Sequence, residues 1–240
     1  MPASHFIALI ENEPAESERL ARQLVRLGIE PLRVADLAEA MDLVKSRAYT
    51  IGAVLLPGDL PPALVRKALR SMRRREPMLP AMAYGKRPGS RQLEGLRRAD
   101  VLLALWEGYD EGALRFQMNR MLSGETQQTV REARRAPWHE PVRISVGGRE
   151  KPGTLYSLSE RGCFIETPRA SMDGARLRLA FDLEGEPVEI DGIVVFANVP
   201  GNLQRPNLPL GMGIRFGEMP RALVRRIGER VRERITLLEV

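Results

Sequence analysis

The hydrophobic pattern of this chain changes period near its middle, and that change constrains the fold more than any other feature. In the first half, short apolar runs alternate with segments whose apolar residues recur at helical spacing. In the second half, short strand-like runs are separated by glycines and prolines. The pattern predicts two domains, and 240 residues suit two domains of roughly 100–130 residues each.

The first half reads as five strands alternating with five helices. We expect strands at residues 5–10, 31–35, 51–56, 79–84 and 101–105, and helices at 15–27, 36–47, 62–75, 90–98 and 109–122. Gly28 is a candidate C-cap and Asp36 a candidate N-cap. The continuous apolar run at 51–56 is typical of a buried central strand. This order predicts a doubly wound α/β sandwich.

The order and size of these elements resemble the receiver domain of bacterial response regulators, over about residues 4–123. The resemblance implies an Asp at the end of the third strand that accepts a phosphoryl group, beside acidic residues that hold Mg²⁺. Here the third strand ends at Leu56 and Pro57, and the acidic positions hold Glu11 and Asn12. Asp59 follows in a loop and is a poor substitute.

Two further positions depart from the receiver pattern. The Ser or Thr expected after the fourth strand falls on Tyr84 and Gly85, and the Lys expected after the fifth falls on Leu105 and Trp106. Phosphoryl transfer depends on positioned charge. The sequence therefore predicts a pseudo-receiver without a phosphoacceptor, serving docking or dimerisation, with residues 106–116 as a candidate contact surface.

The second half reads as a small antiparallel barrel that closes with a helix. A polar stretch at 125–133 suits a linker. We expect strands at 142–146, 153–158, 162–167, 175–182, 188–198 and 211–216, with a loop at 198–209. A helix at 220–237 carries an apolar stripe that packs either on the barrel or on another subunit. The stripe consists of Leu223, Ile227, Val231 and Ile235.

Three segments of this half resemble the PilZ domain. They are the doublet Arg134-Arg135, the run from Ser157 to Ile165 that contains Ser-x-x-Gly, and Gly211-Met-Gly-Ile-Arg-Phe216. The resemblance implies a β-barrel and, in many members, binding of the bacterial second messenger cyclic di-GMP. We therefore expect a receiver-like domain at 1–124, a linker at 125–133, and a PilZ-like barrel with its C-terminal helix at 134–240.

The resemblance also assigns candidate ligand-binding residues. PilZ domains grip cyclic di-GMP with R-x-x-x-R before the first strand and D/N-x-S-x-x-G after it, because guanidinium groups bind phosphates and stack on bases. Here His139 stands in place of the second Arg of the first motif, and Ser157 in place of the Asp or Asn. The candidates are Arg131, Arg134, Arg135, His139, Ser157, Ser159 and Gly162.

Composition excludes several function classes. One cysteine, Cys163, rules out an intramolecular disulfide and a multi-cysteine metal site, and two histidines leave little for catalysis or metal binding. The charge of +6 is spread over both halves and comes from Arg rather than Lys, without the interleaved aromatics of a nucleic-acid surface. No apolar run is long enough to span a bilayer, and no signal peptide is visible.

Two functions fit these observations. The first is a non-enzymatic cytoplasmic signalling adaptor that binds signalling or motility proteins, without a cofactor, a metal, nucleic acid or membrane insertion. The second is a cyclic di-GMP receptor that retains nucleotide binding. A homodimer through the last receiver helix or the C-terminal helix fits either function.

Overall fold

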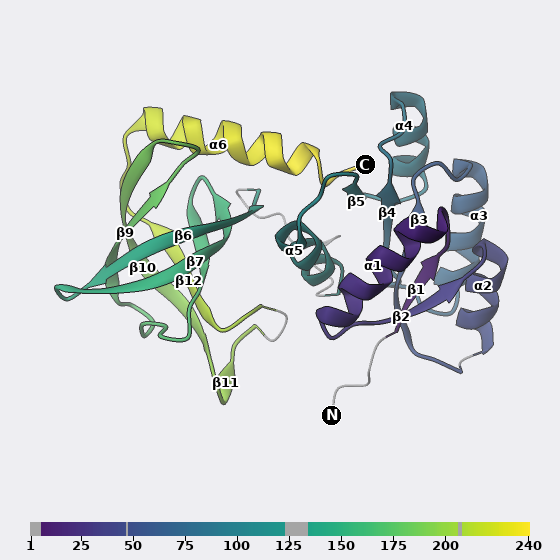
Figure 1. Cartoon of the computed structure of the whole chain (residues 1–240), viewed down its shortest axis with the longest axis horizontal. Helices are drawn as coiled ribbons and strands as arrows, with labels where there is room; N and C mark the ends of the chain where they lie inside the picture. The colour runs from purple at the N-terminus through teal and green to yellow at the C-terminus, as the bar shows by residue number, and fades with distance from the viewer. Residues whose placement is uncertain (1–5, 47, 123–133, 206–207) are drawn as a thin grey trace. The chain divides into compact units, whose positions relative to one another are not determined.

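The computed structural model describes residues 6–46, 48–122, 134–205 and 208–240, which form two compact units (Figure 1). The first unit holds the described residues before 123 together with Leu237–Val240, and the second holds residues 134–236. The expected linker at 125–133 lies outside the described residues. Among the described residues, no helix is long and apolar enough to cross a membrane.

The first unit is built on a five-stranded parallel sheet in the order β2-β1-β3-β4-β5. The strands are β1 (Phe6–Ile10), β2 (Glu30–Val34), β3 (Ile51–Pro57), β4 (Ala81–Gly85) and β5 (Leu103–Trp106). This order is one of the two common doubly wound arrangements, in which ligands bind beyond the carboxyl ends of the strands. The expected α/β sandwich is confirmed.

Five helices cover the two faces of this sheet, with α1 and α5 on one face and α2, α3 and α4 on the other (Figure 1). They are α1 (Pro14–Arg26), α2 (Leu37–Ser46), α3 (Pro62–Arg73), α4 (Ser90–Arg98) and α5 (Glu111–Leu122). Asp36 caps α2, since its carboxylate accepts hydrogen bonds from the backbone of Ala38 and Glu39. Gly28 follows α1 with a φ of 74°, as expected for a C-cap glycine.

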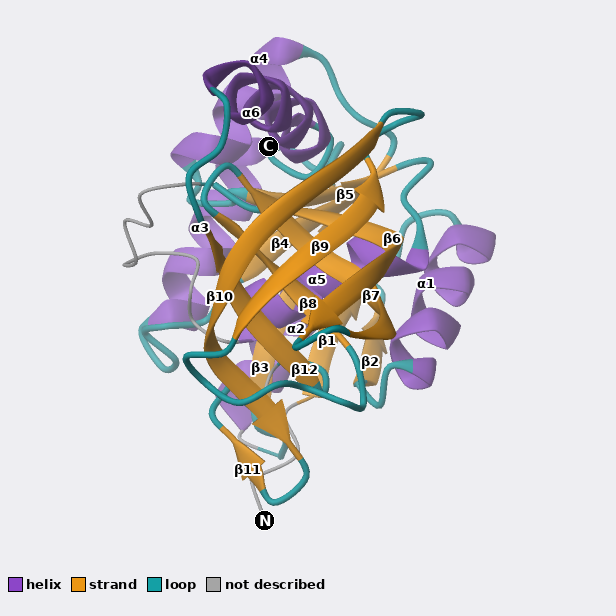
Figure 2. Ribbon diagram, turned by 90° about the vertical axis from the view of Figure 1, so that its left-hand side faces the viewer, coloured by secondary structure: helices purple, strands orange, loops and turns teal. Residues whose placement is uncertain are grey.

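The second unit is an antiparallel barrel of six strands, closed because β9 pairs with both β6 and β10 (Figure 2). Its strands are β6 (Ala136–Val146), β7 (Arg149–Ser159), β8 (Gly162–Glu166), β9 (Arg176–Asp182), β10 (Pro187–Val199) and β12 (Gly211–Phe216). A two-residue strand, β11 (Asn202–Leu203), extends one edge beside β10. The loop expected at 198–209 is thus partly a short hairpin.

The helix α6 (Arg221–Thr236) packs its apolar stripe on the barrel. Ile227, Val231 and Ile235 are buried in the barrel core, and Leu223 packs against its edge. Of the two arrangements open for this stripe, the structure shows packing on the barrel. The residues that follow, Leu237–Val240, belong to the first unit.

Strand β6 begins at Ala136, whereas the sequence led us to expect a strand only from residue 142. Prolines at 137 and 141 are uncommon within a strand, because proline cannot donate a ladder hydrogen bond. The strand accommodates them with a register shift between Pro137 and Glu140. His139 lies in this irregularity with a φ of 38°. The first PilZ-like motif therefore lies partly within the first strand.

Candidate functional site

The carboxyl edge of the parallel sheet holds no side chain that could accept a phosphoryl group at the end of β3. Pro57 occupies that place and is buried. The next residue, Gly58, lies against the indole of Trp106, so closely that a Cβ there would be 2.6 Å from the ring. Packing, rather than charge, fills this position.

Tyr84 of β4 seals the adjacent part of the same edge. Its side chain is buried, and its hydroxyl donates to the carbonyl of Ile10 at 2.6 Å and lies 3.1 Å from the hydroxyl of Ser17. Burial raises the pKa of Tyr84 to about 12. The residue at the Ser/Thr position of the receiver pattern therefore ties β1, α1 and β4 together as a neutral phenol.

The acidic side chains at this edge either form a hydrogen bond with another side chain or are exposed to solvent. Glu11 accepts a hydrogen bond from Arg33 at 2.6 Å, and Asp59 is exposed. Burial raises the pKa of Glu16, with Arg19 acting in the opposite direction and Glu107 adding to the rise. Among the described residues, no group of three or more His, Cys, Asp or Glu side chains is placed to hold a metal ion.

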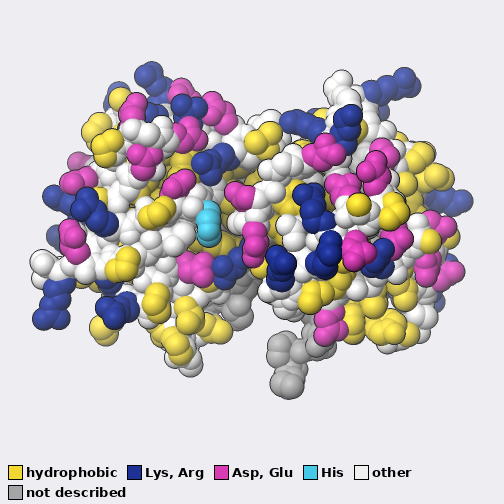
Figure 3. Space-filling view, viewed as in Figure 1, with side chains coloured by type: hydrophobic (Ala, Val, Ile, Leu, Met, Phe, Trp, Pro, Cys, Tyr) yellow, Lys and Arg dark blue, Asp and Glu magenta, His cyan; other side chains and the backbone are white. Residues whose placement is uncertain are grey.

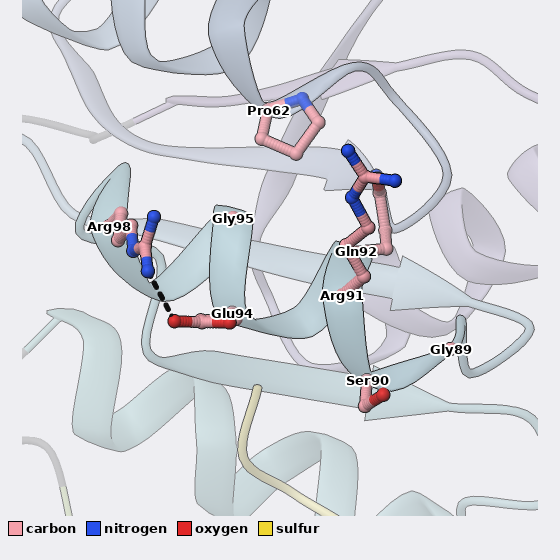
Figure 4. A pocket seen from close by; sticks show the side chains of 8 residues that line it. All are labelled: Pro62, Gly89, Ser90, Arg91, Gln92, Glu94, Gly95 and Arg98. Carbon is pink, nitrogen blue, oxygen red and sulfur yellow. Dashed lines mark hydrogen bonds and ion pairs between the residues drawn. The ribbon is translucent and has the colours of Figure 1, made fainter.

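A groove of about 670 Å³ lies beside α4, and its lining includes Pro62 at the start of α3 and Ser90 at the start of α4 (Figure 4). Its walls are mostly exposed polar side chains, and Glu94 and Arg98 pair across one helical turn. The side-chain amide of Gln92 stabilises the loop between β3 and α3, since it donates to the carbonyls of Gly58 and Leu60. The groove contains no buried titratable group, and we assign it no chemistry.

In the second unit, the two PilZ-like motifs lie side by side. Ala136 and Pro137 of β6 pair with Leu158 and Ser157 of β7, which places Arg135 beside the turn between β7 and β8. Arg134 is exposed and Arg135 half-buried. Arg131 lies outside the described residues. The strand pairing therefore brings together the remaining segments that the resemblance singles out.

The second motif is largely occupied in folding the turn. Ser157 and Ser159 are only 3% and 2% exposed, and the Ser159 hydroxyl donates to the carbonyl of Gly162 at 2.8 Å. A Cβ at Gly162 would lie 2.2 Å from the carbonyl oxygen of Ile214 on β12. The glycine is thus required by close strand packing, and the serine by the turn.

Cys163 follows in β8 and is fully buried. Burial raises the pKa of its thiol to about 12, with the guanidinium of Arg135 acting in the opposite direction. The thiol is therefore protonated at neutral pH and packs as a small apolar side chain.

Helix α6 covers the same end of the barrel with arginines. The guanidinium of Arg234 lies 4.0 Å from the ring centre of buried Trp138 and donates to the carbonyl of Pro137 at 3.4 Å. Arg232 contacts Glu160 in the β7–β8 turn at 3.5 Å. Sequence reasoning missed Trp138 and Arg234, because their contact joins residues far apart in the chain.

Charges of both signs are interspersed on the surface, as Figure 3 shows for one face. On α6, Arg226 pairs with Glu186, while Arg230 and Arg234 pair with Glu184 at 2.9 and 3.7 Å. These exposed pairs are each worth little, but they account for much of the helix's positive charge.

The comparisons with known proteins agree with this division. Residues 129–233 match the profile of the PilZ domain. No curated protein sequence matches this chain.

Solved structures resemble each half separately. The signal receiver domain of an HD domain-containing protein from Pseudomonas fluorescens Pf-5 is 17% identical over 51% of this chain and 90% of that one, with a TM-score of 0.44. The Bacillus subtilis inhibitor of motility, MotI/DgrA, is 16% identical over 45% of this chain, with a TM-score of 0.38, and the match spans about half (52%) of its length. The PilZ domain of CeSA from a cellulose-synthesizing bacterium is 14% identical over 41% of this chain and 95% of that one, with a TM-score of 0.31.

The strand order of the first unit and the PilZ match of the second lead to one conclusion. Residues 129–233 are a PilZ domain, and they follow a unit that is built on a doubly wound, five-stranded parallel sheet.

Proposed function

We propose that this chain is a non-enzymatic, cytoplasmic signalling adaptor that acts through protein–protein contacts in motility, polarity or envelope regulation. It joins a receiver-like domain that does not accept a phosphoryl group to a PilZ domain whose ligand motifs have diverged. The observation that carries the proposal is Pro57, which stands where a receiver needs a nucleophilic carboxylate.

The surroundings of Pro57 support this proposal. Phosphoryl transfer needs a carboxylate nucleophile, a bound cation and a positive side chain near the developing charge. Trp106 packs against Gly58, and the hydroxyl of Tyr84 is hydrogen-bonded to Ile10. Neither Trp106 nor Tyr84 offers the charge that this chemistry requires.

The geometry of the second motif supports the divergence of the PilZ domain. In the resemblance, the hydroxyl and the glycine of this motif approach the nucleotide. Here the Ser159 hydroxyl is buried and bonded to Gly162, and Ser157 is buried without the charge of a carboxylate. The Ser159 hydroxyl thus stabilises the turn irrespective of any ligand, while Ser157 is a buried residue of β7.

A cyclic di-GMP receptor is the second candidate function. Arg134 is exposed and Arg135 lies beside the turn that carries the second motif, and guanidinium groups are well suited to bind phosphate oxygens. His139 is exposed at the irregularity in β6 and adds an imidazole to the same neighbourhood. These positions favour nucleotide binding as the alternative to be tested.

Phosphorylation is tested by incubating the full chain with acetyl phosphate and Mg²⁺ and measuring the intact mass. We expect no phosphoryl addition. The Pro57→Asp variant, under the same conditions, shows whether the missing carboxylate alone accounts for the result. A phosphoryl group found on Asp59 or Glu11 of the natural sequence would contradict the proposal.

Cyclic di-GMP binding is tested by isothermal titration calorimetry of the full chain. The adaptor proposal predicts no saturable binding up to about 1 mM nucleotide, which bounds the binding free energy at about −4 kcal/mol. The receptor candidate predicts saturable binding that Arg135→Ala abolishes and Arg143→Ala leaves unchanged. Arg143 is a matched control because it is an exposed arginine farther along the same strand.

A further inference from the structure

The four residues that follow α6 form a short antiparallel addition to the edge of β5. Leu103 and Glu239 form an antiparallel β-bridge. The amide of Ala104 donates to the carbonyl of Leu238 at 2.9 Å, and the amide of Val240 donates to the carbonyl of Leu102 at 3.2 Å. We call residues 237–240 the tail and its binding place the β5-edge cleft. The cleft is lined by β5, Arg97 of α4 and Gln117 of α5.

Side chains of the first unit bind three consecutive carbonyl groups of the tail. The Gln117 amide donates to the carbonyl of Leu238 and the Trp106 indole to that of Glu239 at 3.1 Å. The Arg97 guanidinium donates to the carbonyl of Val240. These donors contact backbone atoms alone, so they fit any extended peptide whatever its side chains.

The apolar contacts add a simple side-chain requirement. Leu238 and Val240 are 4% and 3% exposed, and Val240 joins the core of the first unit, whereas Leu237 is 60% exposed. Alternate residues of the tail therefore point into the cleft, as in a strand. The cleft selects two apolar side chains separated by one residue.

Two of the donors are buried polar groups that depend on the bound peptide. Gln117 is fully buried, and its amide also donates to the carbonyl of Ala104 at 2.9 Å. Trp106 is almost fully buried. Loss of the tail would leave the Trp106 indole without this acceptor and Gln117 with one acceptor fewer, which is costly in a buried site. These buried donors therefore favour an extended backbone at this edge of the sheet, since each donor needs an acceptor.

We propose that the β5-edge cleft is a peptide-docking site for partner proteins, and that the tail occupies it as a strap in the same chain. The partner it fits presents an extended segment of the pattern apolar-x-apolar, added antiparallel to β5. This inference deepens the proposed adaptor function and rests on it for its biological role. The geometry of the cleft is independent of phosphoryl transfer and of nucleotide binding.

The experiment uses a fluorescent peptide of residues 234–240 and fluorescence polarisation. A chain ending at Thr236 is expected to bind it saturably. The full chain is expected to bind it about tenfold more weakly, since a tethered segment competes at an effective concentration of about 1 mM against a peptide with a Kd of about 100 μM. Peptides carrying the Leu238→Asp and Leu237→Asp changes form a matched pair: the first is expected to lose binding and the second to keep it.

A second measurement protects the test against misfolding of the shortened chain. Full-length Leu238→Asp keeps every residue, and Leu237→Asp is its control. Full-length Leu238→Asp is expected to bind the natural peptide with about the affinity of the shortened chain, and to show faster amide hydrogen exchange at Ala104. Full-length Leu237→Asp is expected to behave as the natural sequence does in both measurements.

Several results would overturn the proposal. They are equal binding to the full and shortened chains, binding to neither, or equal losses from the two substituted peptides. A dimer that dissociates when the tail is removed would also overturn it, because the strap would then come from a second copy. Phosphorylation and cyclic di-GMP titration report on the proposed function separately, so the failure of one is distinguishable from the failure of the other.

Discussion

The substitution Gly162→Ala separates a structural role of the second PilZ-like motif from a ligand-binding role. The added Cβ would lie 2.2 Å from the carbonyl oxygen of Ile214, about 1.2 Å short of an ordinary contact at 3.4 Å. Its neighbours are the backbone of Ile214 and Arg215 on β12, which cannot rotate away as a side chain would. Strands β8 and β12 must therefore separate locally.

The cost follows from the strand pairing. Gly162 pairs with Arg215 and Cys163 with Ile214, so a separation strains or breaks about two backbone hydrogen bonds. At about 1 kcal/mol each, together with 1–3 kcal/mol for overpacking, we expect a loss of about 3–5 kcal/mol in the free energy of unfolding of the barrel. This is a large part of the 5–15 kcal/mol that is typical of a domain.

The assay is urea unfolding followed by tryptophan fluorescence. The chain has two tryptophans, and each lies in a different unit, so a Trp106→Phe background leaves buried Trp138 as the reporter of the barrel. With an m value of about 2 kcal/mol per M, the midpoint should fall by about 1.5–2.5 M. Gly217→Ala is the control, because its added Cβ meets nothing closer than 3.4 Å. Equal midpoints for the two variants would refute the reasoning.

Three further predictions concern Tyr84, Arg234 and Cys163. Tyr84→Phe should destabilise the first unit by about 1–3 kcal/mol, because the Ile10 carbonyl loses its buried donor. Because folding raises the pKa of Tyr84 from 10 to about 12, its contribution is fully present below pH 10 and is lost as the pH rises toward 12; urea midpoints across this range measure it. Arg234→Ala should destabilise the barrel by about 1–2 kcal/mol through the lost contact with Trp138, measured by Trp138 fluorescence. Cys163 should react with iodoacetamide only on unfolding, which intact mass detects.

The Tyr84 and Arg234 predictions each have a matched control. Tyr49→Phe removes the hydroxyl of an exposed tyrosine in the first unit, and Arg225→Ala removes an exposed arginine from α6. Neither substitution should change the free energy of unfolding of its unit by more than about 0.5 kcal/mol. If the Tyr84→Phe variant lost as much stability above pH 10 as the natural sequence does, the loss would come from other titratable groups. Labelling of Cys163 in the native chain at the rate seen in urea would contradict its burial.

The fold was predictable where local pattern decides it. Apolar runs of strand length, the cap at Asp36 and the turn at Gly28 indicate the elements of the first unit without long-range information. The start of β6 was not predictable, because Pro137 and Pro141 argue against a strand and the register shift that accommodates them arises from pairing with β7. The PilZ-like motifs marked a neighbourhood by resemblance, and the burial of Ser159 required the fold.

The β5-edge cleft shows why contacts between distant residues escape sequence reasoning. Glu239 and Trp106 lie 133 residues apart, and no periodicity links them. Trp106 falls where the receiver resemblance expects a lysine, and its two contacts give this substitution a physical meaning. Its ring packs on Gly58, next to Pro57, where the receiver resemblance expects the phosphoacceptor, while its N–H donates to the carbonyl of Glu239 in the tail. A lysine at 106 would supply charge to a reaction for which Pro57 offers no nucleophile, whereas the indole supplies a fixed donor to an extended backbone. The buried indole at 106 therefore offers this edge of the sheet a hydrogen-bond donor for an extended backbone in place of a positive charge.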